Sequence, residues 1–369
     1  MTTLSKEDAI HCAKVFEDYF GNFERIDEYM RDQKLASLSD MTTNPLFPVE
    51  DDLFSDFTMH PNDMEIDVIE CNTGTWETLL NITSSHINIS PVGRQIRLGV
   101  KEKKTNKFLG FIRIGSPVIN CKPRNEMLGQ VFTQKPETAK AFNNTTMMGF
   151  VIVPAQPFGF NYLGGKLLAA ICCSHEVREM INKKYNMNLC MFETTSLYGS
   201  SKSSSQYDGM KPYIRHKGET ESDFLPMMHG KPYEDLRNFV ESKVGKIVED
   251  DISSKKLKTS MRIIALTKAG LKGTEELKRF NEVIENAKNL TEQKRYYISN
   301  YGFRNFIDVV NGKTDILVKD ENYDKFSLAN IITWWKNKAT NRYSTLKEES
   351  RLRTELEVWT SGKDIDIMR

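Results

Sequence analysis

Short apolar runs separated by polar turns fill the chain between residues 64 and 114. The runs DVIECNT, INISPV, RQIRLGV and KFLGFIRIG are rich in β-branched residues and are bounded by residues that favour turns. Such runs are typical of successive β-strands. Within EKKTNKFLG, the polar residues Thr105, Asn106 and Lys107 predict the turn of a hairpin. We therefore expect several antiparallel strands in this segment.

The spacing of apolar residues changes from strand-like to helical within MMGFVIVPAQPFGFNYLGGKLLAA, at residues 147–170. An apolar run ends at a proline, a glycine-containing segment follows, and a helical pattern starts at Leu163. The helix continues through SHEVREMINKKYN, after which LCMFETTSLYG and PYIRHKGET predict two more strands. This order predicts an α+β fold, with a mixed, mainly antiparallel sheet and flanking helices.

Helical spacing of apolar residues marks both ends of the chain. Residues 5–34 predict one or two helices, with Ser5 or Asp8 available as a cap, and an acidic connector follows. Beyond residue 230 the pattern is helical almost to the end and includes EQKRYYISNYGFRNFIDVV. We expect three consecutive parts: N-terminal helices and connector at 1–63, an α/β core at 64–230, and a mildly basic, mainly helical domain at 231–369.

The composition is ordinary for a globular protein, with 39% hydrophobic and 27% charged residues and a net charge of +1. No apolar run is long enough to cross a bilayer, and the N-terminus lacks a secretion signal. We expect a soluble, cytoplasmic protein with no membrane contact. The six cysteines lack the paired spacing of a disulfide framework or a zinc site, so we expect reduced, mostly buried thiols and no metal.

Charge is distributed unevenly along the chain. The first sixty residues carry about eight more acidic than basic side chains, and the chain after residue 230 carries about five more basic than acidic ones. A basic excess suits nucleic acid, and it is also common on solvated helical surfaces. The acidic N-terminus and the helical C-terminal part are both candidates for docking a protein partner.

Gly159, Gly164 and Gly165 lie where the strand that ends near residue 154 gives way to a helix. Glycine lets backbone amides approach a ligand, and a helix start carries partial positive charge, so this segment suits an anion such as a pyrophosphate. The alternative is a buried strand that turns into a packed helix, with glycines for close contact. The pattern alone leaves both open.

The order of motifs between residues 93 and 220 resembles the family named after the A protein of the Druantia anti-phage defence system. The resemblance covers about a third of the chain. Its pieces are GRQIRLGV, FLGFIRIGSP, KPRNEMLG, FNNTTMMGFVIVP, LGGKLLAAI, KKYNMNLCMFETT and YDGMKPYIRHKGET. The resemblance implies a role near nucleic acid in phage–host conflict, in a bacterial or phage-infected cell.

The same order is also similar to that of the Gcn5-related acetyltransferase superfamily. There a Gln/Arg-x-x-Gly-x-Gly/Ala loop receives the pyrophosphate of acyl-coenzyme A, and QPFGFN at 156–161 matches its first four positions. A second register, ending at Gly164, places Tyr162 where glycine is expected. The resemblance implies an acyl-coenzyme A cofactor, and the residues it assigns to that cofactor are Gln156, Gly159, Asn161, Gly164 and Gly165.

Glu193 and Tyr207 are the candidate catalytic residues. Glu193 lies in the apolar strand CMFETT, where burial would raise its pKa toward that of a general base. A buried salt bridge to Arg124 or Arg97, or exposure on a sheet face, is the alternative. Tyr207 falls on a family motif after the serine-rich loop SSKSSSQYDG, and would serve as an acid or stack on a flipped base. Packing of its ring is equally consistent with the pattern.

Nucleic-acid or substrate contact is expected at two sets of residues. Gln95, Arg97, Arg124 and Asn144 fall on family motif positions and have planar hydrogen-bonding groups. The C-terminal helical segment mixes aromatic and basic residues, with Lys336 and Arg342 next to Trp334 and Trp335. The working hypothesis is a DNA-associated protein, which as an enzyme would be an acyl-type transferase modifying DNA bases. The alternative is a non-catalytic DNA-binding or phage structural or assembly module.

Overall fold

The computed structural model describes residues 3–23, 28, 31–32, 34–35, 50–85, 93–118, 120–131, 136–196, 205–220, 228, 230–249, 255–289 and 295–359. It divides into two compact units, each made of two stretches of chain. Unit 1 comprises Met1–Gln33 and Ser222–Glu292, and unit 2 comprises Lys34–Glu221 and Gln293–Arg369. This division differs from the three consecutive parts expected from the sequence, because the chain leaves unit 2 after residue 221 and returns to it at residue 293.

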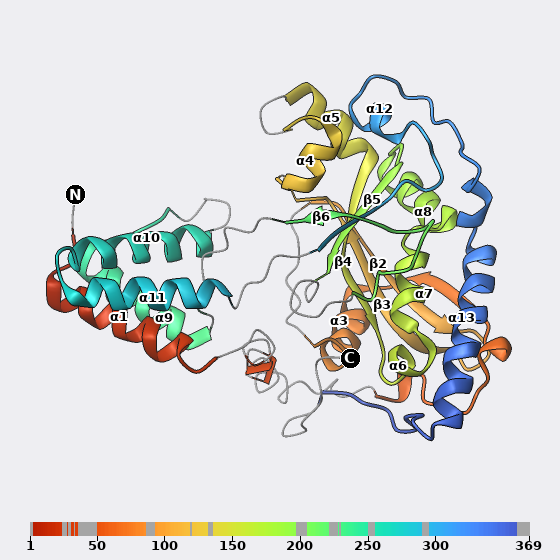
Figure 1. Ribbon diagram of the computed structural model, residues 1–369, viewed down its shortest axis with the longest axis horizontal. Helices are drawn as coiled ribbons and strands as arrows, with labels where there is room; N and C mark the ends of the chain where they lie inside the picture. The colour runs from red at the N-terminus through yellow and green to blue at the C-terminus, as the bar shows by residue number, and fades with distance from the viewer. Residues whose placement is uncertain are drawn as a thin grey trace. The chain divides into compact units, whose positions relative to one another are not determined.

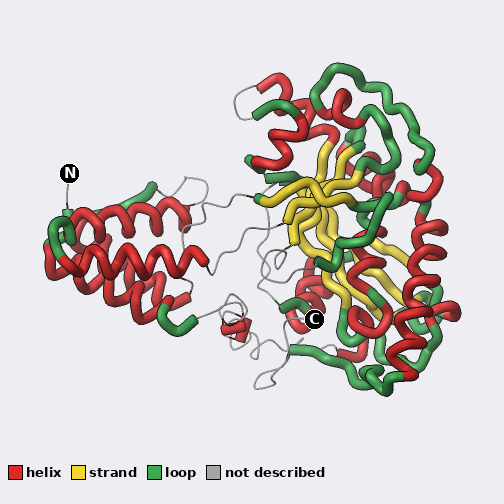
Figure 2. The backbone as a smooth tube through the Cα atoms, viewed as in Figure 1, coloured by secondary structure: helices red, strands yellow, loops and turns green. Residues whose placement is uncertain are grey.

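Unit 2 contains a sheet whose described strands lie in the order β1-β2-β3-β4-β5-β7-β6 (Figures 1 and 2). The strands are β1 (Ile66–Glu70), β2 (Gln95–Glu102), β3 (Lys107–Gly115), β4 (Thr146–Pro154), β5 (Met191–Ser196), β6 (Arg215–Glu219) and β7 (Arg295–Ser299). Only β4 and β5 pair in parallel among these, and every other neighbouring pair is antiparallel. The predicted α+β class with a mixed, mainly antiparallel sheet is confirmed.

A helical crossover joins β4 to β5, as a parallel pair requires. It consists of α6 (Phe158–Tyr162), α7 (Gly164–Ile171) and α8 (His175–Tyr185). The two strands pair only from Thr146 and Met191 to Gly149 and Thr194. Beyond that point β4 continues along β3 and β5 continues along β7, so the two strands separate.

Helices cover both faces of the sheet (Figure 2). On one face lie α3 (Thr73–Thr83) and α4 (Lys122–Leu128), and Trp76 of α3 donates its indole N–H to the Leu98 carbonyl at 3.0 Å. α5 (Pro136–Thr145) packs against β4 and against α12 (Phe306–Val310). On the other face lie α7 and α13 (Leu328–Glu348), and the fully buried Trp335 donates to the Tyr162 carbonyl at 2.8 Å. The main hydrophobic core is on this second face.

Residues 295–299 form β7 instead of continuing a helix, so the helix expected there was wrong. Tyr296 and Ile298 face one side of the sheet, and Tyr297 and Ser299 face the other. Because all four side chains are buried, the strand shows no alternation of apolar and polar residues that would identify it. The helix α3 was also not expected. The predicted strand INISPV and the first half of the serine-rich loop lie outside the described residues.

Unit 1 contains four described helices with their own core. They are α1 (Lys6–Phe20), α9 (Gly230–Val244), α10 (Lys255–Gly270) and α11 (Glu275–Asn289). The side chain of Ser5 accepts the Asp8 amide at the start of α1, so Ser5 is the cap and Asp8 lies inside the first turn. A Cβ on Gly270 would lie 2.6 Å from that of Ala9, so this glycine permits the close approach of α10 to α1.

No helix among the described residues is long and apolar enough to cross a membrane. Five of the six cysteines are buried and Cys71 is half-buried, and all six are free thiols. The expectation of mostly buried thiols is thus confirmed.

Candidate functional site

The segment expected to hold an anion is largely helical, and its first amides are used within the chain. The amide of Gly159 donates to the Ala155 carbonyl at 2.9 Å, and that of Asn161 donates to the Pro157 carbonyl at 2.8 Å. The amide of Phe160 donates to the Gln156 side-chain oxygen at 3.1 Å. These amides therefore satisfy α6 and do not face a ligand.

Gln156 and Asn161 were expected in an open cofactor-binding loop, but both form hydrogen bonds to the C-terminal segment of the chain. Asn161 is fully buried, donates to the Arg353 carbonyl at 2.7 Å and accepts from the Arg353 amide at 3.2 Å. The Gln156 carbonyl accepts from the Glu357 amide at 2.9 Å. Both residues thus have structural partners, which explains why an asparagine stands where the acetyltransferase pattern has a small residue.

Gly164 and Gly165 begin α7 and allow two close contacts. A Cβ on Gly164 would lie 2.6 Å from the Phe158 ring, and one on Gly165 would lie 2.4 Å from the side-chain oxygen of Gln206. The Lys166 ammonium donates to the carbonyls of Gln206 at 3.0 Å and Asp208 at 2.5 Å. These hydrogen bonds therefore hold residues 206–208 against the first turn of α7.

Glu193 is sealed inside unit 2 in an ion pair with Arg124. The two side chains are 0% exposed, and the Arg124 Nη1 lies 2.8 Å from the Glu193 Oε1. The Tyr296 hydroxyl donates to the Glu193 Oε2 at 2.6 Å, and the Arg124 guanidinium lies 4.5 Å from the Phe142 ring centroid. Burial raises the pKa of Glu193, against the opposing effects of Arg124 and Tyr296. The arrangement found is the buried salt bridge to Arg124.

Tyr207 lies on the opposite face of the sheet from Glu193. Its side chain is 5% exposed, and its ring centroid lies 5.2 Å from that of Tyr297. Burial raises its pKa, and its hydroxyl bonds to Thr194, the neighbour of Glu193 on β5. Because successive side chains on a strand point to opposite faces, the structure does not bring Glu193 and Tyr207 together.

The remaining family-motif residues do not form one surface with Arg124. Arg97 pairs with Glu77 at 3.3 Å, and its guanidinium lies 5.8 Å from the Trp76 ring centroid. Gln95 is half-buried, and its backbone amide donates to the Tyr185 hydroxyl at 3.0 Å. Asn144 is exposed in the last turn of α5.

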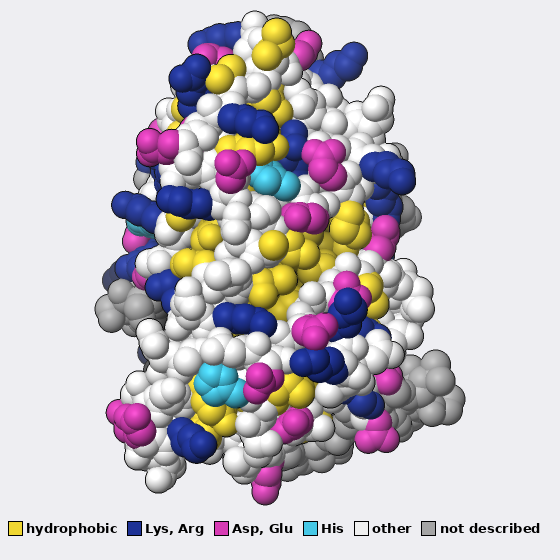
Figure 3. Space-filling model, turned by 90° about the vertical axis from the view of Figure 1, so that its right-hand side faces the viewer, with side chains coloured by type: hydrophobic (Ala, Val, Ile, Leu, Met, Phe, Trp, Pro, Cys, Tyr) yellow, Lys and Arg dark blue, Asp and Glu magenta, His cyan; other side chains and the backbone are white. Residues whose placement is uncertain are grey.

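The aromatic and basic residues of α13 are mostly used within unit 2. Trp335 is 0% and Tyr343 is 6% exposed, so neither ring offers a free face to a base. The Lys336 ammonium donates to the Asn62 carbonyl at 2.9 Å, and the Arg342 guanidinium lies 4.8 Å from the Phe160 ring centroid. Basic and acidic side chains are interspersed on the face shown in Figure 3. Of the other residues expected there, Trp334 is half-buried, Lys338 lies 5.6 Å from its ring centroid, and Lys338 and Lys347 are exposed, so nucleic-acid contact on α13 stays a prediction for this smaller set.

Comparison with known proteins supports the Druantia resemblance for part of the chain. Residues 60–202 match the family described as Druantia protein DruA. The Druantia protein DruA of Escherichia coli (strain UMEA 4076-1) is 27% identical over 168 residues, or 40% of this chain and 40% of that protein. The chain thus matches well under half the length of this relative. No solved structure matches the chain significantly, so the acetyltransferase resemblance gains no support there.

The DruA-like segment runs from the turn before β1 to the residues after β5. It contains the Glu193–Arg124 pair and the helical crossover, and it excludes Tyr207 and α13. Because the pair is fully buried, its place in the matched segment indicates a contribution to the fold of that segment. The range begins and ends earlier than the motifs at 93–220 noted in the sequence.

A basic surface on α10 lies outside the DruA-like segment and was not among the sites expected from the sequence. The helix carries five basic side chains and no acidic one. Lys258 and Arg262, one turn apart, are exposed, and neither side chain has a partner among the described residues. Ala265 and Ala269 continue the same exposed stripe, and Met261 beside it is 47% exposed. We call this stripe, from residue 258 to 269 and including Lys268, the α10 stripe.

The α10 stripe faces solvent because the opposite side of α10 is buried. Ile263, Ile264 and Leu266 are buried in the unit 1 core, so the opposite side of the helix faces solvent. Lys256, near the start of the helix, is attracted to Glu234 of α9, whereas the α10 stripe contains no carboxylate. The absence of Asp and Glu over sixteen residues was the signal in the sequence that could have revealed this surface.

Proposed function

We propose that this protein takes part in anti-phage defence and binds nucleic acid through the α10 stripe. The match of residues 60–202 to Druantia protein DruA supports the biological setting. The proposal gives no catalytic role to Glu193 and Tyr207, since one is sealed in an ion pair and the two lie on opposite faces of the sheet.

The single observation that carries the binding proposal is the uncompensated charge of the α10 stripe. Lys258, Arg262 and Lys268 lie on a helix without acidic residues, and the two alanines between and beyond them leave room for close approach. From Lys258 to Lys268 the helix advances by about 15 Å. A DNA duplex carries about nine phosphates over such a length. A polyanion therefore complements this surface in both charge and extent.

Binding of the full chain to labelled duplex and single-stranded DNA, followed by fluorescence anisotropy, tests the proposal. We expect binding whose logarithmic association constant falls linearly with the logarithm of salt concentration, because each lysine or arginine contact releases counterions from the phosphates. The absence of binding at low salt, or binding insensitive to salt, would remove the α10 stripe as a nucleic-acid interface.

A second candidate function is acyl transfer, which one observation favours. The strands β4 and β5 separate beyond Gly149 and Thr194, and α7 begins with two glycines, the first of which packs against Pro154 at the end of β4. For coenzyme binding, the Gln206 side chain would have to leave Gly165, and Lys166 would have to release residues 206 and 208.

Thermal melting with acetyl-coenzyme A separates the two functions. If the coenzyme binds, a concentration one hundred times its dissociation constant adds about 2.7 kcal/mol to the free energy of unfolding. We expect no change in melting temperature with acetyl-coenzyme A and an increase with DNA. An increase with the coenzyme alone would favour the transferase.

A further inference from the structure

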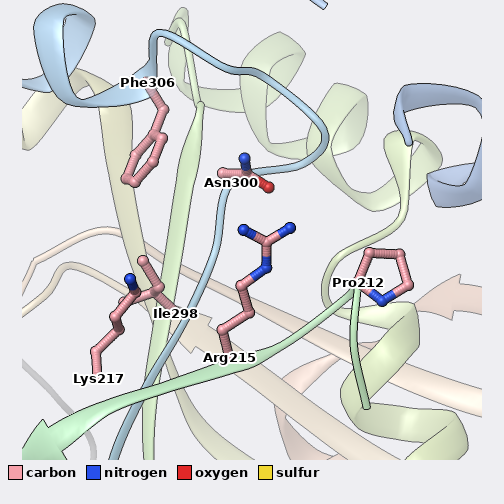
Figure 4. A pocket seen from close by; sticks show the side chains of 6 residues that line it. All are labelled: Pro212, Arg215, Lys217, Ile298, Asn300 and Phe306. Carbon is pink, nitrogen blue, oxygen red and sulfur yellow. The ribbon is translucent and has the colours of Figure 1, made fainter. Parts of the chain in front are cut away.

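A small hollow opens at the β6 edge of the sheet, away from the residues that the sequence singled out. It is shallow and open to solvent on one side (Figure 4). Its lining residues are Pro212, Arg215, Lys217, Ile298, Asn300 and Phe306. Because β6 is the last strand in the sheet order, the hollow lies at an edge that no further described strand covers.

Arg215 and Lys217 place two positive charges in this hollow. They stand at alternate positions of β6, and Figure 4 shows both side chains on the same side of the strand, toward the segment with Asn300 and Phe306. Arg215 is half-buried and Lys217 is exposed, and within the described parts of the chain neither side chain has a partner. The β6–β7 register shifts between His216 and Glu219, so Lys217 lies within this irregularity.

No described carboxylate lines the hollow to balance these charges. Ile298 pairs with both Arg215 and Glu193 in the sheet, but Glu193 is fully buried and neutralised by Arg124. The Asn300 side chain is committed to its own loop, where it donates to the Phe303 carbonyl at 3.0 Å and accepts from the Gly302 amide at 3.2 Å. The hollow thus offers two cations without a described partner, beside the apolar side chains of Pro212, Ile298 and Phe306.

We propose that this hollow binds the phosphate group of a phosphomonoester, with Arg215 and Lys217 as its charged donors. A phosphomonoester carries between about one and a half and two negative charges near neutral pH, which matches the two cations. The arginine fork can donate two hydrogen bonds to neighbouring phosphate oxygens, and the lysine supplies a point charge. A backbone phosphodiester has a single charge and matches the hollow less well. This proposal does not depend on the α10 stripe.

Titration calorimetry of the full chain tests the proposal with three probes. They are inorganic phosphate, a nucleoside 5′-monophosphate, and a short single-stranded oligonucleotide with a 5′-phosphate, compared with the same oligonucleotide ending in a 5′-hydroxyl. We expect the 5′-phosphate to strengthen oligonucleotide binding. Tighter binding of the phosphorylated oligonucleotide than of the monophosphate supports a nucleic-acid end as the source. Equal affinity supports a small phosphomonoester.

In the double variant Arg215→Gln with Lys217→Gln, the affinity for the phosphate-bearing probes should fall by about tenfold or more, because each charged hydrogen bond contributes about 1.5–3 kcal/mol. Lys211→Gln, which removes an exposed cation of the same segment outside the hollow, should change affinity less than about twofold. Arg215→Lys keeps the charge but loses the fork, and should bind with intermediate affinity. Melting curves of each variant report whether it folds.

Two results would overturn the proposal. One is a wild-type chain that binds no phosphate probe and does not distinguish the phosphorylated from the hydroxyl oligonucleotide. The other is a folded Arg215→Gln, Lys217→Gln variant that binds the probes as tightly as the wild type. Binding of hydroxyl-ended duplex DNA through the α10 stripe should be unchanged in this variant, so failure of one proposal is distinguishable from failure of the other.

Discussion

Reversing the two exposed charges of the α10 stripe, with Lys258→Glu and Arg262→Glu, should weaken duplex DNA binding about 60-fold at 0.1 M salt. Each phosphate contact contributes a factor of about eight at this salt relative to 1 M, because log K falls with a slope of about 0.9 per contact. Losing both contacts multiplies the two factors. Both residues are exposed and have no described partner, so we expect the variant to fold normally. Fluorescence anisotropy at fixed salt measures the loss.

The matched control reverses two cations on α11, Lys278→Glu and Lys288→Glu. It produces the same change in net charge, but Lys278 pairs with Glu275 and Lys288 pairs with Glu285 on the same helix. We expect it to change affinity by less than about threefold, since both lysines already have a glutamate partner on α11 and salt at 0.1 M screens exposed charges beyond about 10 Å. An equal loss in both variants would show that net charge alone, and not the α10 stripe, governs binding.

Replacing Arg124 by methionine should lower the free energy of unfolding of unit 2 by about 3–5 kcal/mol, because it leaves the Glu193 carboxylate buried without its counter-charge. Arg124 and Glu193 are both 0% exposed, so the carboxylate that remains is cut off from bulk solvent. The contact with the Phe142 ring is lost as well. Urea unfolding followed by tryptophan fluorescence measures the change.

Two comparisons make this result specific to the buried charge. The double variant Arg124→Met with Glu193→Leu removes both charges and should recover most of the stability, because apolar replacements of a buried pair are often neutral or stabilising. Arg97→Met breaks the partly exposed pair with Glu77 and should cost about 1 kcal/mol or less. If Arg124→Met costs no more than Arg97→Met, the buried pair does not have the structural role assigned to it.

Local sequence patterns predicted much of the sheet. β1, β2 and β3 were signalled by short β-branched runs between turn residues, and the hairpin turn near Asn106 lies between β2 and β3. The apolar runs before Pro154 and around Phe192 predicted β4 and β5, and the short segment PYIRHKGET predicted β6. β7 was not predicted because its side chains are buried on both faces, which removes the alternation of apolar and polar residues that identifies a strand. Its place between β5 and β6 also depends on pairing between segments that most of unit 1 separates in the sequence, which no local pattern encodes.

The candidate site was less predictable, because it depends on which side chains meet in space. Glu193 was identified as buried, but its partner lies 69 residues away and was one of two arginines considered. Gln156 and Asn161 fit a cofactor motif in part, and their partners lie in the C-terminal segment around residues 353–357. The α10 stripe and the β6 hollow were missed for a simpler reason: they consist of exposed cations, which a sequence contains in large numbers.

The proposed function requires contact between the α10 stripe and DNA phosphates. The salt dependence of DNA binding tests this contact directly. The logarithm of the association constant is measured against the logarithm of salt concentration for the wild type and for Lys258→Glu with Arg262→Glu. We expect a slope that is shallower in the variant by about 1.8, the value for two lost phosphate contacts. An unchanged slope would mean that these residues do not touch the DNA and would contradict the proposed role of the α10 stripe.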